Sequence, residues 1–447
     1  MTLAAALLGF FVITLDAVIV NVALPSIGAD LSGGVTGLQW VFDGYTLPFA
    51  ALLISAGSLS DRIGARRAFG AGVSGFVLAS AACGLAWSLP ALIAARLVQG
   101  AAAAVIMPSA MSLLREAYPE PGPRARALAV WATGGALAST SAPVLGGLLG
   151  AVDWRLIFLI NIPVGAAGLV LLARARRSPR QPAAFDVVGQ ITAVIAMGGL
   201  TYGVIEAGAV GFGEPRVLVA LALAVIASVV FVLAQLRVAH PMVPPDLFRS
   251  RTVPVSLLIG FTFMVGFYGL PFVFSLYLQQ VRGLSSLATG LVFLPMMLIG
   301  LALTPFTARL GARFGRLPLI VTGLLAMTAG PAVMALLPPS APVWTLAVLL
   351  TLVGLGGPLV MPPTMTVLLD HAPGPLAGTA SGLFHTSRQV GGALTIAVFG
   401  AMLTDPDSFL SGVRTSLLIA TGITAVAATM TLLLRGSFTT PRSWTEK

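Results

Sequence analysis

Charge is scarce in this chain: 9% of its 447 residues are charged, whereas 57% are hydrophobic. A soluble domain carries about 25% charged residues, so this composition excludes a fold that exposes its whole surface to water. The single cysteine, Cys83, excludes an intramolecular disulfide and a cysteine-based metal site. The sequence also lacks a phosphate-binding loop and a cluster of metal ligands, so it indicates no enzyme and we expect no cofactor.

Long apolar runs are what the chain has instead, and its mean hydropathy is +0.98. A membrane-spanning helix needs about 20 apolar residues, and this length predicts fourteen spans. They are expected near residues 3–24, 38–59, 68–88, 91–114, 126–150, 155–173, 186–206, 216–236, 254–278, 287–308, 318–337, 342–368, 378–403 and 411–434. The first run has no basic segment before it, which favours a retained span over a cleaved leader. The prediction is an all-α polytopic membrane protein surrounded by the lipid bilayer.

The basic residues indicate the orientation of these spans. The predicted loops alternate, with nineteen of the 25 Lys and Arg residues on one side and only Arg155, Arg216, Arg282 and Arg414 on the other. Because Lys and Arg concentrate in short cytoplasmic loops, both termini are predicted to be cytoplasmic. The net charge of +10 therefore reflects membrane orientation, and no nucleic-acid partner is expected.

Two sequence segments recur along the chain. Gly100–Ser112 resembles Gly354–Thr366, and Arg62–Gly64 resembles Arg313–Gly315, at offsets of 254 and 251 residues. Each offset pairs a predicted span with the span eight places later, which indicates duplicated six-helix halves with two helices inserted between them. Chance similarity of Gly-rich apolar text is the alternative. The predicted division is an N-terminal bundle over 1–175, inserted helices over 176–250 and a C-terminal bundle over 251–447.

Ionisable residues at membrane depth are the strongest functional candidates, because each is costly unless it is paired or faces a cavity. Asp16 lies about 12 Å below the outer end of the first span, and Asp43 and Arg96 are expected at similar depth. A buried carboxylate beside an arginine can change protonation state when the cavity opens to one side. We therefore predict proton coupling by Asp16, Asp43 and Arg96. Structural pairing, or side chains that extend to the membrane interface, is the alternative.

The C-terminal half has its own polar group at depth. Arg388 lies about 15 Å into the thirteenth span, next to His385 and Gln389. With Asn21 and Gln99, these three residues are candidates for a substrate cavity. A packing role is the alternative for His385.

Several motifs resemble the major facilitator superfamily, specifically its fourteen-helix drug:proton antiporter branch of the EmrB and QacA type. Leu15–Pro25 is similar to the branch's first-span signature, and Trp154–Gly165 and Gly382–Gly392 to two later ones. Arg96, Gln99 and Gly100 match an element associated with proton transfer. Val18, Ala142 and His385 depart from the usual residues. The resemblance implies a major facilitator fold, with two six-helix bundles and two inserted helices.

Two further motifs imply moving parts. The segment Gly57–Arg67 looks like the superfamily's cytoplasmic gating motif, in which charges pair across the halves in the outward-facing state. The candidate gating residues are Gly57, Asp61, Arg62, Gly64 and Arg66, with Arg313 and Gly315 in the second half. The exporter element of the fifth span is represented by Pro143, Gly146 and Gly147, whose spacing suits helices that slide against each other.

The resemblance and the buried charges together predict proton-coupled efflux of drugs or of a metabolite by alternating access. The expected substrates are small amphipathic or cationic molecules, and protons are the coupling ion. The location is expected to be a bacterial inner membrane, and a monomer is plausible. An importer or uniporter with the same fold is the main alternative, and a membrane sensor without transport activity is another. Spacing alone does not define a substrate.

Overall fold

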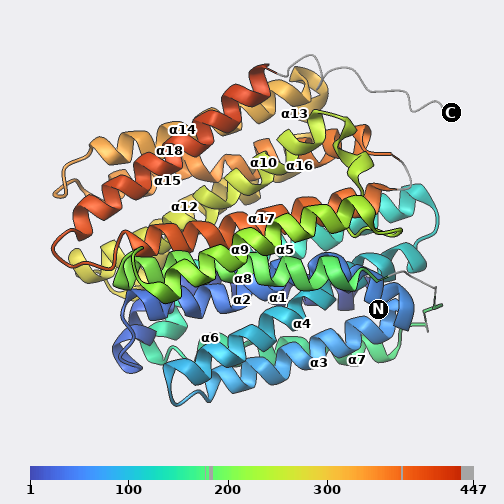
Figure 1. The fold of residues 1–447 in the computed structure, drawn as a ribbon, viewed down its shortest axis with the longest axis horizontal. Helices are drawn as coiled ribbons and strands as arrows, with labels where there is room; N and C mark the ends of the chain where they lie inside the picture. The colour runs from blue at the N-terminus through green and yellow to red at the C-terminus, as the bar shows by residue number, and fades with distance from the viewer. Residues whose placement is uncertain (177, 181–184, 374–375, 434–447) are drawn as a thin grey trace. The chain divides into compact units, whose positions relative to one another are not determined.

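Helices joined by loops and turns form the described part of the chain, which comprises residues 1–176, 178–180, 185–373 and 376–433 of a computed structural model (Figure 1). Thirteen helices or helix pairs are long and apolar enough to cross a membrane. The helix Ala377–Ala401 has 25 residues and the length of a span, but it is less apolar than these thirteen. Thirteen of the fourteen predicted spans are therefore confirmed, and the remaining one coincides with the helix Ala377–Ala401. The predicted end of the last span at 434 and the basic residues Arg435, Arg442 and Lys447 lie outside the described residues.

Two compact units make up the fold. Unit 1 consists of Met1–Met242 and Ser275–Leu291, and unit 2 of Val243–Phe274 and Val292–Lys447. The predicted division at residues 175 and 250 remains a prediction. The helices of the first 242 residues are α1 Thr2–Asp30, α2 Val35–Ile63, α3 Ala65–Gly84, α4 Leu89–Ala117, α5 Pro121–Val152, α6 Leu156–Leu159, α7 Asn161–Ala173, α8 Val187–Val210 and α9 Pro215–Arg237.

The later helices are shorter and more often interrupted. They are η1 Pro245–Arg249, α10 Thr252–Met264, η2 Val265–Gly269, α11 Leu270–Leu276, η3 Tyr277–Val281, α12 Ser286–Leu303, η4 Thr304–Phe306, α13 Thr307–Phe314, α14 Arg316–Leu336, α15 Val343–Gly354, α16 Gly356–His371, α17 Ala377–Ala401 and α18 Phe409–Leu433. The segments η2 and η3 are π-helical turns within one continuous pass. Such turns are rare and often lie at functional sites.

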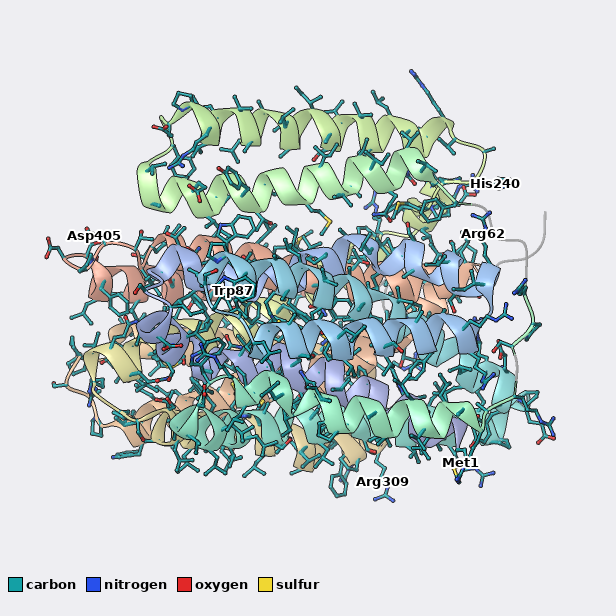
Figure 2. The ribbon with its side chains drawn as sticks, turned by 90° about the horizontal axis from the view of Figure 1, so that it is seen from below. Met1, Arg62, Trp87, His240, Arg309 and Asp405 are labelled. Carbon is teal, nitrogen blue, oxygen red and sulfur yellow. The ribbon has the colours of Figure 1, made fainter. Side chains whose placement is uncertain are left out.

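Within unit 1, α1 packs mainly on α5, and α4 packs on both α2 and α3. The inserted helices α8 and α9 lie side by side (Figures 1 and 2). Met1, Arg62 and His240 lie at one end of the helices of unit 1, and Trp87 lies toward the other end (Figure 2). This arrangement places the turn between α2 and α3 at the same end as the N-terminus.

The turn after α2 has a counterpart in unit 2. Gly64 and Gly315 have φ angles of +90° and +88°, and each ends one helix and begins the next. Residues other than glycine rarely adopt this left-handed conformation. In each unit the backbone N–H of this glycine donates to the carbonyl four residues earlier. The two sequence segments that resemble each other therefore form the same turn.

Candidate functional site

An ion pair between Asp16 on α1 and Arg96 on α4 lies at the centre of unit 1. Arg96 Nη1 donates to Asp16 Oδ2, and both side chains are 0% exposed. A charged side chain at this depth is costly unless it is paired and hydrogen-bonded. The pairing therefore explains how both charges are accommodated in an apolar bundle.

Neutral polar side chains complete the coordination of Asp16. Its Oδ1 atom accepts hydrogen bonds from Gln99 Nε2 and Asn161 Nδ2, each at 2.8 Å. Gln99 also donates to Ser80 Oγ at 2.8 Å and accepts from Arg96 Nη1 at 2.8 Å. These residues belong to α1, α3, α4 and α7. The Asp16 carboxylate thus connects α1, α4 and α7 directly, and Gln99 extends the network to α3.

Arg96 has further partners on α2. Its Nε donates to the Val41 carbonyl at 3.0 Å, and its guanidinium carbon lies 4.5 Å from the ring centroid of Tyr45. Tyr45 in turn donates its hydroxyl to the Ile13 carbonyl on α1 at 2.9 Å. An aromatic face attracts a desolvated cation, so these contacts stabilise the buried guanidinium and link α2 to the network.

Asp43 lies apart from this ion pair, although it is also 0% exposed. It is two residues from Val41, or about 200° around α2, and therefore points away from Arg96. Its Oδ1 accepts from Thr46 Oγ1 at 3.1 Å, while Oδ2 has no hydrogen-bond partner among the described residues. The structure thus brings Asp16, Arg96 and Gln99 together. Asp43 lies apart from them, and only one of its two carboxyl oxygens accepts a hydrogen bond from a described residue.

The predicted cavity residues lie in different environments. Asn21 is buried in α1, where its carbonyl accepts from Ser275 Oγ at 2.6 Å and its Oδ1 has no described partner. His385, Arg388 and Gln389 share one face of α17 and are partly exposed. Arg388 Nε and Gln389 Oε1 also have no described partner. The structure therefore shows two separate polar regions, one in each unit.

The predicted gating residues of unit 1 surround the turn between α2 and α3. Arg62 lies in the last turn of α2. Gly57 lies one helical turn before Asp61, and a Cβ atom at Gly57 would lie 3.9 Å from Pro108 Cβ. Asp61 lines a cavity of about 320 Å³ together with Glu116.

Ser178 and the Arg66 side chain tie three helices together beside this turn. The backbone N–H of Arg66 donates to Ser178 Oγ at 3.0 Å, and Ser178 donates to Glu116 of α4. The Arg66 side chain donates to the carbonyls of Leu172 and Ala173 at the end of α7. The cytoplasmic ends predicted for α3, α4 and α7 are thus joined through Ser178 and Arg66.

Unit 2 makes a simpler connection at its equivalent turn. Arg316, the first residue of α14, forms an ion pair with Asp370, the second-to-last residue of α16. Arg313 lies over the ring of Phe314, with 5.3 Å between guanidinium carbon and centroid. Glu116 is likewise the second-to-last residue of α4. An acidic residue thus lies at the second-to-last position of both α4 and α16. Glu116 in unit 1 bonds a serine, whereas Asp370 in unit 2 pairs with an arginine.

The predicted exporter element in α5 packs very closely within unit 1. A Cβ atom at Gly146 would lie 2.9 Å from the Ile19 carbonyl oxygen, and one at Gly147 would lie 2.7 Å from Leu287 Cα. The Pro143 carbonyl oxygen lies 2.2 Å from where a Cβ of Gly290 would be. Small residues at these positions therefore permit the backbones of α5, α1 and α12 to approach one another.

Sequence reasoning did not select Ser80 or Tyr45, although both contact the central network. A serine or tyrosine in an apolar span is common, and a serine often bonds the carbonyl four residues earlier in its own helix. The position along the helices could have indicated Ser80, because Ser80 and Arg96 lie at comparable distances from the loop that joins α3 to α4.

Comparison with known proteins identifies the family. The family model of the Major Facilitator Superfamily matches residues 6–396. The chain belongs to this superfamily. It is 36% identical over 412 residues to the "Methylenomycin A resistance protein" of Streptomyces coelicolor, covering 92% of this chain and 87% of that protein.

Other similar proteins agree with this assignment. The "Tetracenomycin C resistance and export protein" of Streptomyces glaucescens is 39% identical over 417 residues, which cover 90% of this chain and 75% of that protein. The crystal structure of a POT family transporter in complex with 5-aminolevulinic acid superposes with a TM-score of 0.71 at 14% identity, covering 97% and 96% of the two chains. The major facilitator fold predicted from the sequence is confirmed.

Proposed function

We propose that this chain exports small amphipathic molecules across a bacterial inner membrane by alternating access, in exchange for protons. It would then belong to the fourteen-helix drug:proton antiporter branch of its superfamily. The names of relatives that are 36–39% identical over most of the chain support export and resistance. The bias of Arg toward one set of loops supports cytoplasmic termini.

The buried carboxyl groups support the proton part of the proposal, and Asp43 carries it. The Asp43 Oδ2 atom is buried without a described hydrogen-bond partner. A carboxyl group can take up a proton at such an atom without losing an existing hydrogen bond, and burial favours its neutral form. Asp43 is therefore the proposed site of proton uptake and release.

Asp16 and Arg96 are proposed to support proton coupling in a different way. All three hydrogen bonds to Asp16 come from N–H donors. A proton bound to this carboxyl group would therefore point toward one of these donors and break the hydrogen bond from that donor. Protonation of Asp16 would thus disturb the contacts between α1, α4 and α7. The ion pair is expected to hold these helices together while Asp43 exchanges its proton.

Liposomes that contain the purified full-length chain test the proposal. With the lumen made acidic and the cytoplasmic face outside, we expect uptake of at least one of three labelled probes: cationic ethidium, neutral N-phenyl-1-naphthylamine or anionic 1-naphthoate. Asp43→Asn should still bind that probe but fail to accumulate it. Asp405→Asn is the matched control, because the Asp405 carboxylate accepts from Asp407 N and Ser408 Oγ of its own loop.

Two outcomes would contradict the proposal. If wild-type protein accumulates none of these probes above protein-free liposomes, export of amphipathic molecules is wrong. If Asp43→Asn accumulates a probe to the wild-type level, proton exchange at Asp43 is wrong even though export stands.

A further inference from the structure

Arg388 is a cation in the middle of a span of unit 2. It lies eleven residues after the first residue of α17 and thirteen before the last. The other charged residues described in unit 2 lie within about two helical turns of a helix end or in loops. Substrate sites of transporters with duplicated halves lie near the middle of the membrane, which is the depth of Arg388.

Within the described part of unit 2, no carboxylate pairs with this guanidinium. The described acidic residues of this unit are Asp246, Asp370, Asp405 and Asp407. Asp246 pairs with Arg249 at 3.1 Å and Asp370 with Arg316, while the other two lie in the loop before α18. Among the described residues Arg388 forms no ion pair, and its Nε has no hydrogen-bond partner.

An unpaired arginine at this depth is unusual because a charge in the bilayer centre costs several kcal/mol. Such residues face the protein interior or a water-filled cavity, and they mark substrate or ion pathways. Arg388 is partly exposed as a residue, while its Nε atom is buried. Close packing of its stem limits its movement, because Cγ lies 3.3 Å from where a Cβ of Gly260 would be.

Aromatic rings lie beside the guanidinium. The guanidinium carbon lies 5.5 Å from the ring centroid of Phe263, which stacks on Phe267 at 5.1 Å and 22°. From 262 to 270, Phe267 is partly exposed and its neighbours are buried. Phe267 belongs to the π-helical turn η2, which packs on α17. A cation and an accessible aromatic surface are thus presented side by side.

We propose that Arg388 binds the anionic group of an amphipathic organic acid, and that Phe263 and Phe267 contact its apolar ring. The proposal names a substrate class for the export function proposed above and rests on it. A guanidinium can hold a carboxylate with two parallel N–H···O bonds.

The same features disfavour a cationic substrate at this position. A ligand ammonium group next to Arg388 would be repelled in a low-dielectric environment. A neutral ligand would leave the guanidinium without an anionic partner, so only the aromatic contact would favour binding of this ligand. Acidic ligands should therefore be preferred over neutral and cationic ligands that have the same ring.

Binding of three probes with one common ring tests this proposal. We would measure equilibrium dialysis of 1-naphthoate, 1-naphthamide and 1-naphthylmethylammonium with the full-length chain in nanodiscs of neutral lipid. The wild-type chain should bind 1-naphthoate most tightly. Arg388→Gln should weaken 1-naphthoate binding on the order of ten- to a hundredfold and leave 1-naphthamide within about twofold.

Two matched variants keep the test independent of folding. Arg388→Lys retains the charge but not the two parallel donors, so 1-naphthoate should be weakened less than by Arg388→Gln. Arg414→Gln, which removes an exposed arginine near the start of α18, should change neither probe. Because binding needs no proton gradient, the result does not depend on whether the chain transports these probes.

The proposal would be overturned if the wild-type chain binds 1-naphthamide or 1-naphthylmethylammonium as tightly as 1-naphthoate, or binds no 1-naphthoate. It would also be overturned if Arg388→Gln weakens the acid and the amide equally. Binding of 1-naphthoate without its uptake into liposomes would contradict export of this probe while supporting the site.

Discussion

Removing one partner of the ion pair between Asp16 and Arg96 should destabilise unit 1 severely. Arg96→Met leaves the Asp16 carboxylate at 0% exposure with two amide donors and no cation. Asp16→Asn leaves the guanidinium with its contacts to Val41, Gln99 and Tyr45 but no counter-charge. Breaking a buried pair from one side costs about 3–5 kcal/mol, so each single variant should lose about that much free energy of unfolding.

The double variant Asp16→Asn with Arg96→Met should lose less free energy of unfolding than the two single variants lose together. It buries no charge, and its asparagine can still accept from Gln99 or Asn161. We expect a favourable coupling energy on the order of 2–4 kcal/mol from the double-mutant cycle.

Reversible unfolding in mixed micelles with increasing SDS, followed by far-UV circular dichroism, measures these free energies. Asp405→Asn serves as a control, because its carboxylate lies in an exposed loop. Additive single effects, or single losses below about 1 kcal/mol, would refute the conclusion that this pair is desolvated and structurally coupled.

Two further predictions concern packing. Gly100→Ala would place a Cβ 2.1 Å from the Tyr45 carbonyl oxygen, so α2 and α4 must separate; we expect a loss of about 1–3 kcal/mol, measured in the same unfolding assay. Gly198→Ala, which meets no atom within 4 Å, should be neutral, and equal effects would contradict the close approach at Gly100. Asp186→Ala removes the acceptor for Gly189 N, Gln235 Nε2 and Met242 N, so limited proteolysis near α8 and α9 should become faster. Asp186→Asn keeps an acceptor oxygen and should be cleaved more slowly than Asp186→Ala, and the opposite order would contradict this assignment.

The spans and part of the central network could be predicted from sequence because depth along a helix follows from residue counting. Arg96 and Gln99 are three residues apart and therefore share a helix face, and Asp16 was expected at a matching depth. The direction in which a side chain points around its helix could not be predicted in the same way. Asp43 has the right depth, yet it points away from Arg96 because Val41, Gly44 and Tyr45 form the face of α2 that meets α4.

Other features depend on contacts between distant segments. The role of Ser178 requires the end of α7 to lie beside the turn after α2, and no spacing rule predicts that. The isolation of Arg388 is different, because the sequence already shows that the middle of each C-terminal span lacks acidic residues. What the structure adds is its position beside Phe263 and the unsatisfied Nε.

Binding of substrate and binding of a proton are proposed to exclude each other, and Asp43 is the proposed site of the proton. Proton release from purified protein in weakly buffered detergent solution, measured with a pH-sensitive dye on addition of a transported probe, tests it most directly. We expect release from the wild-type chain and from Asp405→Asn, and none from Asp43→Asn. Equal release from Asp43→Asn, or no release from wild-type protein that binds the probe, would contradict it.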